Sequence, residues 1–102
     1  MKQLILVALF VSVSADAAAA KTIRNACLKS ERGRGKVQLC SCIQQVADRS
    51  LSQRDQKKAA VLFNDPERAQ RIRTSDSKSD EKFWDRYQVF GTAAEALCRR
   101  QQ

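Results

Sequence analysis

Four cysteines carry the best-defined chemistry in this chain of 102 residues. They are Cys27, Cys40, Cys42 and Cys98. The chain has no histidine, and the spacing Cys-x12-Cys-x-Cys-x55-Cys lacks the close cysteine pairs that tetrahedral zinc sites use. In an oxidising compartment, an even number of cysteines in a short chain instead predicts two disulfides. A thiol-redox site at the Cys-x-Cys pair is the less favoured alternative, in which Lys36 and the start of a helix would activate a thiolate.

The spacing of Cys40 and Cys42 limits how the disulfides can form. Side chains two positions apart on a helix point about 200° apart, so a bond between these two would require the helix to unwind. We therefore expect one of them to pair with Cys27 and the other with Cys98, which links the second helix to both ends of the domain. The spacing leaves open which of the two bonds Cys27.

Three arginines, Arg68, Arg71 and Arg73, are candidate anion-binding residues. Guanidinium groups bind carboxylates and phosphates through paired hydrogen bonds, so a group of them could hold an anion. The favoured interpretation is that they form the solvated face of an amphipathic helix, with Ala69 and Ile72 turned inward.

The remaining polar residues do not form a catalytic pattern. Without histidine, proton transfer would fall to other groups such as carboxylates, but Glu81 and Asp85 are expected on the outer face of the last helix. No serine stands in a nucleophile-elbow pattern, and no glycine-rich phosphate loop occurs. We therefore expect no catalytic residue, no cofactor and no metal.

Helical periodicity runs through residues 21–102 without a strand pattern, so the predicted fold is all-α, a small bundle of about four to five helices held by two disulfides. We expect helices over 22–30, from about 37, from the Ser52 cap to about 63, from Pro66 until the helix fades at Thr74, and over 79–99. Ser52 and Asp55 resemble a capping box, in which each side chain bonds the backbone N–H of the other.

The last helix is expected to turn one continuous face inward. That face comprises Phe83, Tyr87, Phe90, Ala94, Leu97 and Cys98, bordered by Trp84 and Gly91. Its aromatic residues have the spacing of a buried face, which is favoured over a stacking platform for single-stranded nucleic acid. Gly91 is expected to permit the close approach of another helix.

Residues 1–20 have the composition of a cleavable secretory signal peptide. Lys2 supplies a positive charge, an uncharged apolar run from Leu4 to Val13 follows, and Ala15-Asp16-Ala17 matches the small-residue cleavage pattern. The run of about ten residues is shorter than the roughly 20 that span a bilayer, so an uncleaved anchor is the less favoured alternative. We expect cleavage near Ala17–Ala20, a mature domain over 21–102, and a periplasmic or secreted location.

The chain is strongly basic, with 19 lysines and arginines, 11 acidic residues and a net charge of +8. Loss of residues 1–20 would remove one lysine and one aspartate, so the net charge of the remaining domain would be the same. A charge of this size favours an acidic protein or an anionic surface as the partner, and nucleic acid is the less expected polyanion. The other interpretation is that the charge is an ordinary property of an exported protein and indicates no particular partner.

Several segments carry a resemblance that covers nearly the whole of residues 21–102. They read TIRNAC from Thr22, LCSCIQQVAD from Leu39, DPERAQ from Asp65, FWDRY from Phe83 and AAEALC from Ala93. Together they resemble a family of small exported alphaproteobacterial proteins whose members often carry the label "arginine transporter". The resemblance implies no catalytic residue. A domain of this length is also too short for the two lobes of a typical solute receptor, so the label implies at most an accessory role.

The sequence thus predicts a small exported binding or interaction protein with no chemistry of its own, which meets an acidic partner through its basic surface. An accessory role in arginine transport is the alternative. A thiol-redox or other enzyme is the least favoured function.

Overall fold

A computed structural model of the chain describes residues 21–101 and places them in five α-helices and one short 3-10 helix. These are α1 (Thr22–Lys29), α2 (Val37–Ser50), α3 (Gln53–Leu62), α4 (Pro66–Arg73), α5 (Lys78–Cys98) and η2 (Arg99–Gln101). No strand occurs within 21–101, and the predicted all-α fold is confirmed. The predicted signal peptide falls on residues 1–20, which lie outside the described part of the chain.

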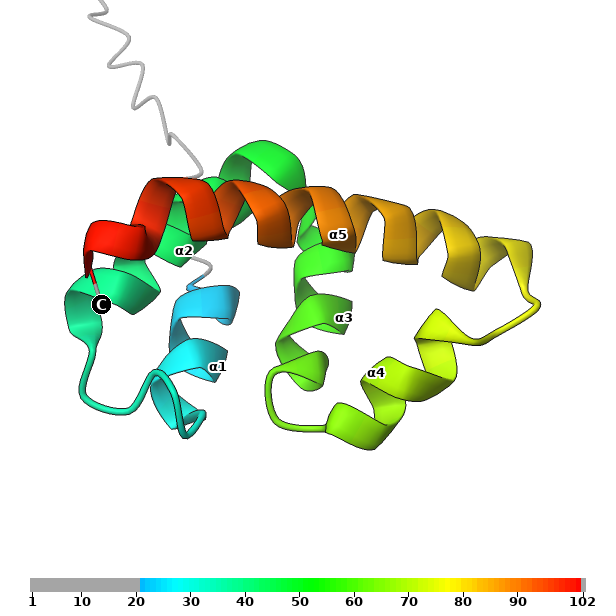
Figure 1. Cartoon of the computed structure of the whole chain (residues 1–102), viewed down its shortest axis with the longest axis horizontal. Coiled ribbons are helices and arrows are strands. Elements are labelled where there is room, and N and C mark those ends of the chain that lie inside the picture. Colours follow the sequence, from blue (N-terminus) through cyan, green and yellow to red (C-terminus); the bar gives the residue numbers. More distant parts are fainter. Residues whose placement is uncertain (1–20, 102) are drawn as a thin grey trace, which may run out of the picture.

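The longest helix, α5, crosses the whole domain, with α1, α3 and α4 below it and α2 passing behind it (Figure 1). α2 packs on α1 and on α5, α1 packs also on α3, and α4 lies beneath the N-terminal half of α5. Because α2 contacts both α1 and α5, it is the central helix of the fold. None of the helices described here combines the length and apolarity that crossing a bilayer requires.

Two of the predicted helix starts carry side-chain caps. Ser52 Oγ accepts a hydrogen bond from the Asp55 backbone N–H at 3.1 Å. The Asp65 carboxylate accepts one from the Arg68 backbone N–H at 3.0 Å. The capping box at the start of α3 forms on one side only, because the Asp55 carboxylate binds Arg86 instead of the backbone of Ser52.

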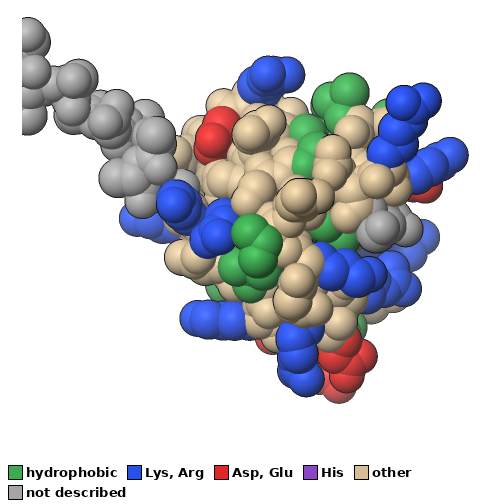
Figure 2. All heavy atoms as spheres, turned by 90° about the vertical axis from the view of Figure 1, so that its left-hand side faces the viewer, with side chains coloured by type: hydrophobic (Ala, Val, Ile, Leu, Met, Phe, Trp, Pro, Cys, Tyr) green, Lys and Arg blue, Asp and Glu red, His purple; other side chains and the backbone are tan. Residues whose placement is uncertain are grey.

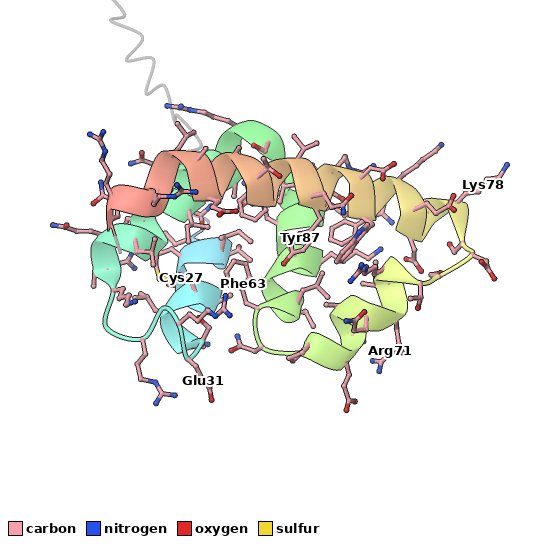
Figure 3. The ribbon with its side chains drawn as sticks, viewed as in Figure 1. Cys27, Glu31, Phe63, Arg71, Lys78 and Tyr87 are labelled. Carbon is pink, nitrogen blue, oxygen red and sulfur yellow. A yellow bond between two sulfur atoms is a disulfide. The ribbon has the colours of Figure 1, made fainter. Side chains whose placement is uncertain are left out.

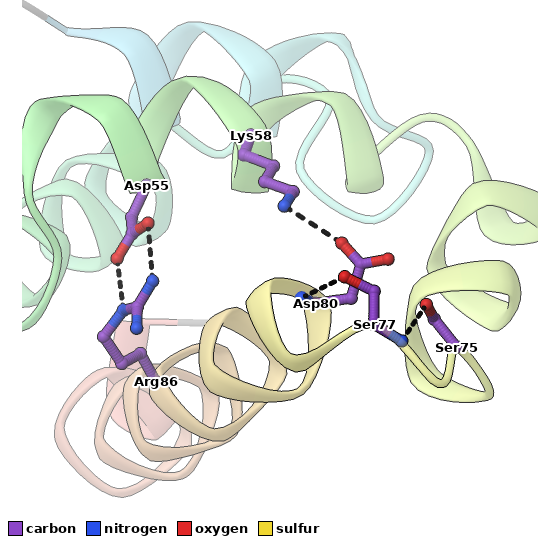
Figure 4. A network of polar contacts seen from close by, with 6 residues as sticks. All are labelled: Asp55, Lys58, Ser75, Ser77, Asp80 and Arg86. Carbon is purple, nitrogen blue, oxygen red and sulfur yellow. Dashed lines mark hydrogen bonds and ion pairs between the residues drawn. The ribbon is translucent and has the colours of Figure 1, made fainter.

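Two ion pairs join α3 to α5 (Figure 4). Arg86 holds Asp55 through two hydrogen bonds, from Nε to Oδ2 at 2.5 Å and from Nη2 to Oδ1 at 3.1 Å, and the hydrogen bonding raises the pKa of Arg86. Lys58 Nζ lies 3.3 Å from Asp80 Oδ1. Hydrogen bonds from Ser75 and Lys58 lower the pKa of the Asp80 carboxyl. The Asp55–Arg86 pair is the stronger of the two, because it is bidentate and its carboxylate is nearly buried.

The apolar core lies between α5 and the helices packed against it. Its buried members are Ile23, Val46, Ala47, Leu51, Ala59, Leu62, Ile72, Phe83, Phe90, Ala94 and Cys98. The prediction for Leu97 is wrong, since its side chain is 62% exposed. Leu97 lies about 100° round the helix from Cys98, and the disulfide holds Cys98 inward.

The prediction that Gly91 receives another helix of this chain is also wrong. Gly91 is exposed, and a Cβ built on it would have no atom within 4 Å. No other described helix therefore covers the surface over Gly91.

A buried cluster of amide side chains, which the helical pattern does not reveal, ties three helices together. Gln56 on α3 is fully buried, and its Oε1 accepts a hydrogen bond from Gln44 Nε2 on α2 at 2.9 Å. Both amides also donate to Asp48 Oδ1, at 2.8 Å and 3.2 Å. The backbone N–H of Arg24 on α1 donates to Gln44 Oε1 at 2.9 Å. Because every buried side-chain nitrogen and oxygen among the described residues has a partner, this cluster adds specificity without an unpaired group.

The structure contains two disulfides, as the sequence predicts, and both involve α2. Cys27 on α1 bonds Cys40, and Cys42 bonds Cys98 at the end of α5, with Cα–Cα distances of 5.5 Å and 5.8 Å. Cys40 and Cys42 are therefore not bonded to each other, and the partner of Cys27, which the spacing leaves open, is Cys40. No cysteine is free.

Replacing Cys42 and Cys98 together by serine should lower the free energy of unfolding by about 4 kcal/mol, and replacing Cys27 and Cys40 by about 3 kcal/mol. The first bond closes a chain separation of 56 residues and the second one of 13, so the first removes more entropy from the unfolded chain. Urea unfolding without reductant measures both losses. Unchanged unfolding midpoints in both double variants would contradict this role of the disulfides.

Candidate interaction surface

The two disulfides bring together basic residues from distant parts of the chain at one end of the domain. The turn between α1 and α2 and the helix η2 both lie there (Figure 1). We define the basic end as the exposed cations of these two segments, Arg32, Arg34, Lys36, Arg99 and Arg100. Figure 2 faces this side of the molecule and shows lysine and arginine side chains projecting from much of its outline.

Acidic groups are few at the basic end. Glu31 lies in the same turn and is exposed. Glu95 forms an ion pair with Arg99 at 3.4 Å, in which both side chains are about seven-tenths exposed. Such an exposed pair one helical turn apart is weak, so Arg99 remains available to another anion.

Gly33 fixes the turn that carries three of these cations. It is buried, and a Cβ at this position would lie 2.0 Å from the Cys27 carbonyl oxygen and 2.7 Å from Cys27 Sγ. The Gly33 N–H donates to Ser30 Oγ at 3.1 Å, and Ser30 Oγ donates to the Cys27 carbonyl at 2.6 Å. Gly35 then reverses the chain with a φ of +76°. The turn is thus held directly against the Cys27–Cys40 disulfide.

A cleft of about 1160 Å³ opens beside the basic end. Arg32 and Lys36 from the turn and Arg99 from η2 lie along it, and Leu39 and Ile43 of α2 contribute apolar side chains. A hollow of about 460 Å³ continues along α5 towards Trp84. The two share Ile43, Phe63, Gly91, Ala94 and Glu95, so they form one groove, which we call the α5 groove.

The aromatic residues of α5 divide between the core and this groove. Phe83 and Phe90 are buried, whereas Trp84 and Tyr87 are partly exposed and line the groove. The Trp84 and Tyr87 ring centroids are 5.3 Å apart. Tyr87 and Phe63 both lie below α5 in Figure 3. Burial raises the pKa of the Tyr87 phenol.

The arginines that the sequence singles out on α4 do not converge. Arg68, Arg71 and Arg73 are all exposed. Helical geometry places Arg73 about 140–160° round α4 from the other two, so one anion would not meet all three. Arg71 also lies towards the opposite end of the domain from Cys27 (Figure 3).

The other candidate groups lie where they were expected, without forming a site. Glu81 and Asp85 are exposed on α5. Within residues 21–101, no three cysteine or acidic side chains gather in the manner of a metal site. Arg99 and Arg100 were not predicted to be functional residues. Their position directly after Cys98 could have indicated such a role, because a disulfide from Cys98 to Cys42 places them next to α2.

No family model, curated protein or solved structure matches this chain. The resemblance to small exported alphaproteobacterial proteins and the role in arginine transport therefore stay predictions. The charges and the groove of this chain are the observations that bear on its function.

Replacing Gly33 by alanine should destabilise the protein strongly, because the new methyl group would overlap the Cys27 carbonyl and sulfur. Gly35→Ala is the matched control in the same turn. Its added Cβ meets nothing within 4 Å, so it should cost only about 1 kcal/mol, from the left-handed backbone. Thermal unfolding compares the two variants, and a smaller loss for Gly33→Ala than for Gly35→Ala would contradict the packing of this turn.

Tyr87 is the single tyrosine of the chain, so phenol absorbance reports its titration alone. Burial raises its pKa, so the phenol should titrate above pH 10 in the folded protein. In the unfolded protein in urea it should titrate at about pH 10. The unfolded chain releases this proton first, so the free energy of unfolding should fall as the pH rises past about 10. Coincident titration curves in buffer and in urea would contradict the burial of Tyr87.

Proposed function

We propose that this chain is a small exported interaction protein that binds an acidic protein partner through its basic end. The observation that carries this proposal is the gathering of five exposed cations from two segments, one after Cys27 and one after Cys98, at one end of a cross-linked domain. A charged surface attracts an oppositely charged partner over a distance. A rigid domain also loses little conformational entropy when it binds.

The charge balance supports an acidic partner. The net charge of the chain is +8, and Glu31 and Glu95 are the acidic residues that line the cleft beside the basic end. Arginine predominates among the cations there, and its planar guanidinium binds carboxylates in a bidentate manner. A partner with clustered aspartate or glutamate side chains is complementary to such a surface.

The disulfides support an oxidising location. Bonds of this kind persist in the periplasm and outside the cell, and they are rare in the cytosol. Two disulfides are compatible with a periplasmic or secreted protein, and the composition of residues 1–20 favours export. Because all four thiols are bonded, the proposal assigns no reaction to them.

Reversing two charges of the basic end, Arg34→Glu with Arg100→Glu, should weaken the binding of poly-L-glutamate at low salt by at least about tenfold. Arg71→Glu with Arg73→Glu is the matched control, since it makes the same change of net charge at exposed positions on α4. The control should lose about threefold or less, because α4 lies away from the basic end (Figure 1), so its arginines would not contact an anion bound there. Biolayer interferometry at two salt concentrations measures all three affinities.

Equal losses of affinity in the two double variants would show that net charge alone attracts the anion, and this would contradict the proposal. A larger loss in the α4 variant would move the anion site to the α4 arginines. Binding that does not weaken with salt would exclude a charge-based interaction.

A further inference from the structure

Gly91 occupies an unexpected position for a glycine. It lies inside the long helix α5, where glycine destabilises a helix relative to alanine. Helix glycines usually allow another backbone to come close, but nothing in the described chain lies within 4 Å of a Cβ at Gly91. The folded domain therefore gains nothing from the missing side chain.

The same glycine lies at the centre of the α5 groove. The larger cleft and the smaller hollow share Gly91, and Ile43 and Phe63 from other elements also line both. Trp84 and Arg99 mark the two ends of the groove along α5. Arg99 follows Trp84 by 15 residues, which span about 22 Å at about 1.5 Å per residue. That is the length of a helix of about four turns.

Apolar and charged groups are segregated along the α5 groove. Near Trp84 the lining is aromatic and polar but uncharged, as Tyr87 and Gln88 illustrate. At the other end three cations, Arg32, Lys36 and Arg99, line the cleft together with two carboxylates, Glu31 and Glu95, so positive charge is in excess there. The groove is also open along its length, whereas a small-molecule site encloses most of its ligand. An extended partner with an apolar stripe and an acidic end is complementary to this lining.

We propose that the α5 groove binds an amphipathic α-helix of an acidic partner protein. The apolar stripe of that helix lies along α5 over Gly91, and its acidic end meets Arg32, Lys36 and Arg99. Recognition of a helix by an apolar groove is a common mode of peptide binding. This inference rests on the proposed function, and it adds the form of the partner and the surface on which it lies.

The test uses a peptide of about 16 residues with leucine along one helical face, glutamate in its first turn, and no tryptophan. A second peptide has the same composition with the leucines scrambled. Trp84 is the single tryptophan of the chain, so its fluorescence reports occupancy of the groove. We expect the amphipathic peptide to shift the Trp84 emission to shorter wavelength and to bind at least tenfold more tightly than the scrambled one.

Gly91→Leu should lower the affinity for the amphipathic peptide at least tenfold, because its side chain fills the groove. Val89→Leu is the matched control, since Val89 is 67% exposed on α5 and does not line the groove. It should leave the affinity unchanged. Gly91→Ala should raise the thermal midpoint of the free protein, which shows that the position tolerates a side chain.

Several outcomes would overturn the inference. Equal, salt-sensitive binding of both peptides would refute the groove while leaving the proposed function intact, and no binding of either peptide or of poly-L-glutamate would refute both. Peptide binding that survives Gly91→Leu would place the helix elsewhere. A Trp84 shift that only anionic phospholipid vesicles produce would assign the groove to a membrane surface, and a dimer in sedimentation that Gly91→Leu dissolves would assign it to a second copy.

Discussion

Two disulfides that leave α2 from Cys40 and Cys42 set the arrangement of the whole domain. The two sulfurs point to different sides of the helix, so one bond draws α1 against α2 and the other draws the end of α5 against it. A domain of this length buries a small core, and cross-links that restrict its unfolded chain supply stability that packing alone lacks. The amide cluster around Gln56 and the Asp55–Arg86 pair then fix the position of α3 against these three helices.

The same cross-links create the surface that we propose to be functional. Cys27 and Cys98 are each followed by a basic segment, and their bonds to α2 bring the two segments to one end of the molecule. Gly33 lets the first segment fold tightly over the Cys27–Cys40 bond. Between that end and Trp84, a groove runs along α5 over Gly91, and Ile43 of α2 and Phe63 also line it.

The helices themselves could be predicted closely, because their signals are local. Ser52 and the Asp65-Pro66 pair mark two helix starts, and the spacing of Phe83, Phe90 and Ala94 marks the buried face of α5. The errors concern Leu97 and Gly91, both near the edge of that face. Whether an edge position is covered depends on which neighbouring helix reaches it, and periodicity along one helix contains no such information.

The sequence by itself determined an all-α chain, two disulfides, the exclusion of a Cys40–Cys42 bond and a strongly basic charge, since all of these follow from composition and from spacing along a helix. Only the tertiary structure decided that Cys40 bonds Cys27, that Gln44 and Gln56 share a buried cluster, and that Arg32 and Arg99 line one cleft. Those facts depend on contacts between residues far apart in the chain. Such contacts are selected by the packing of whole helices against each other, which no local pattern specifies.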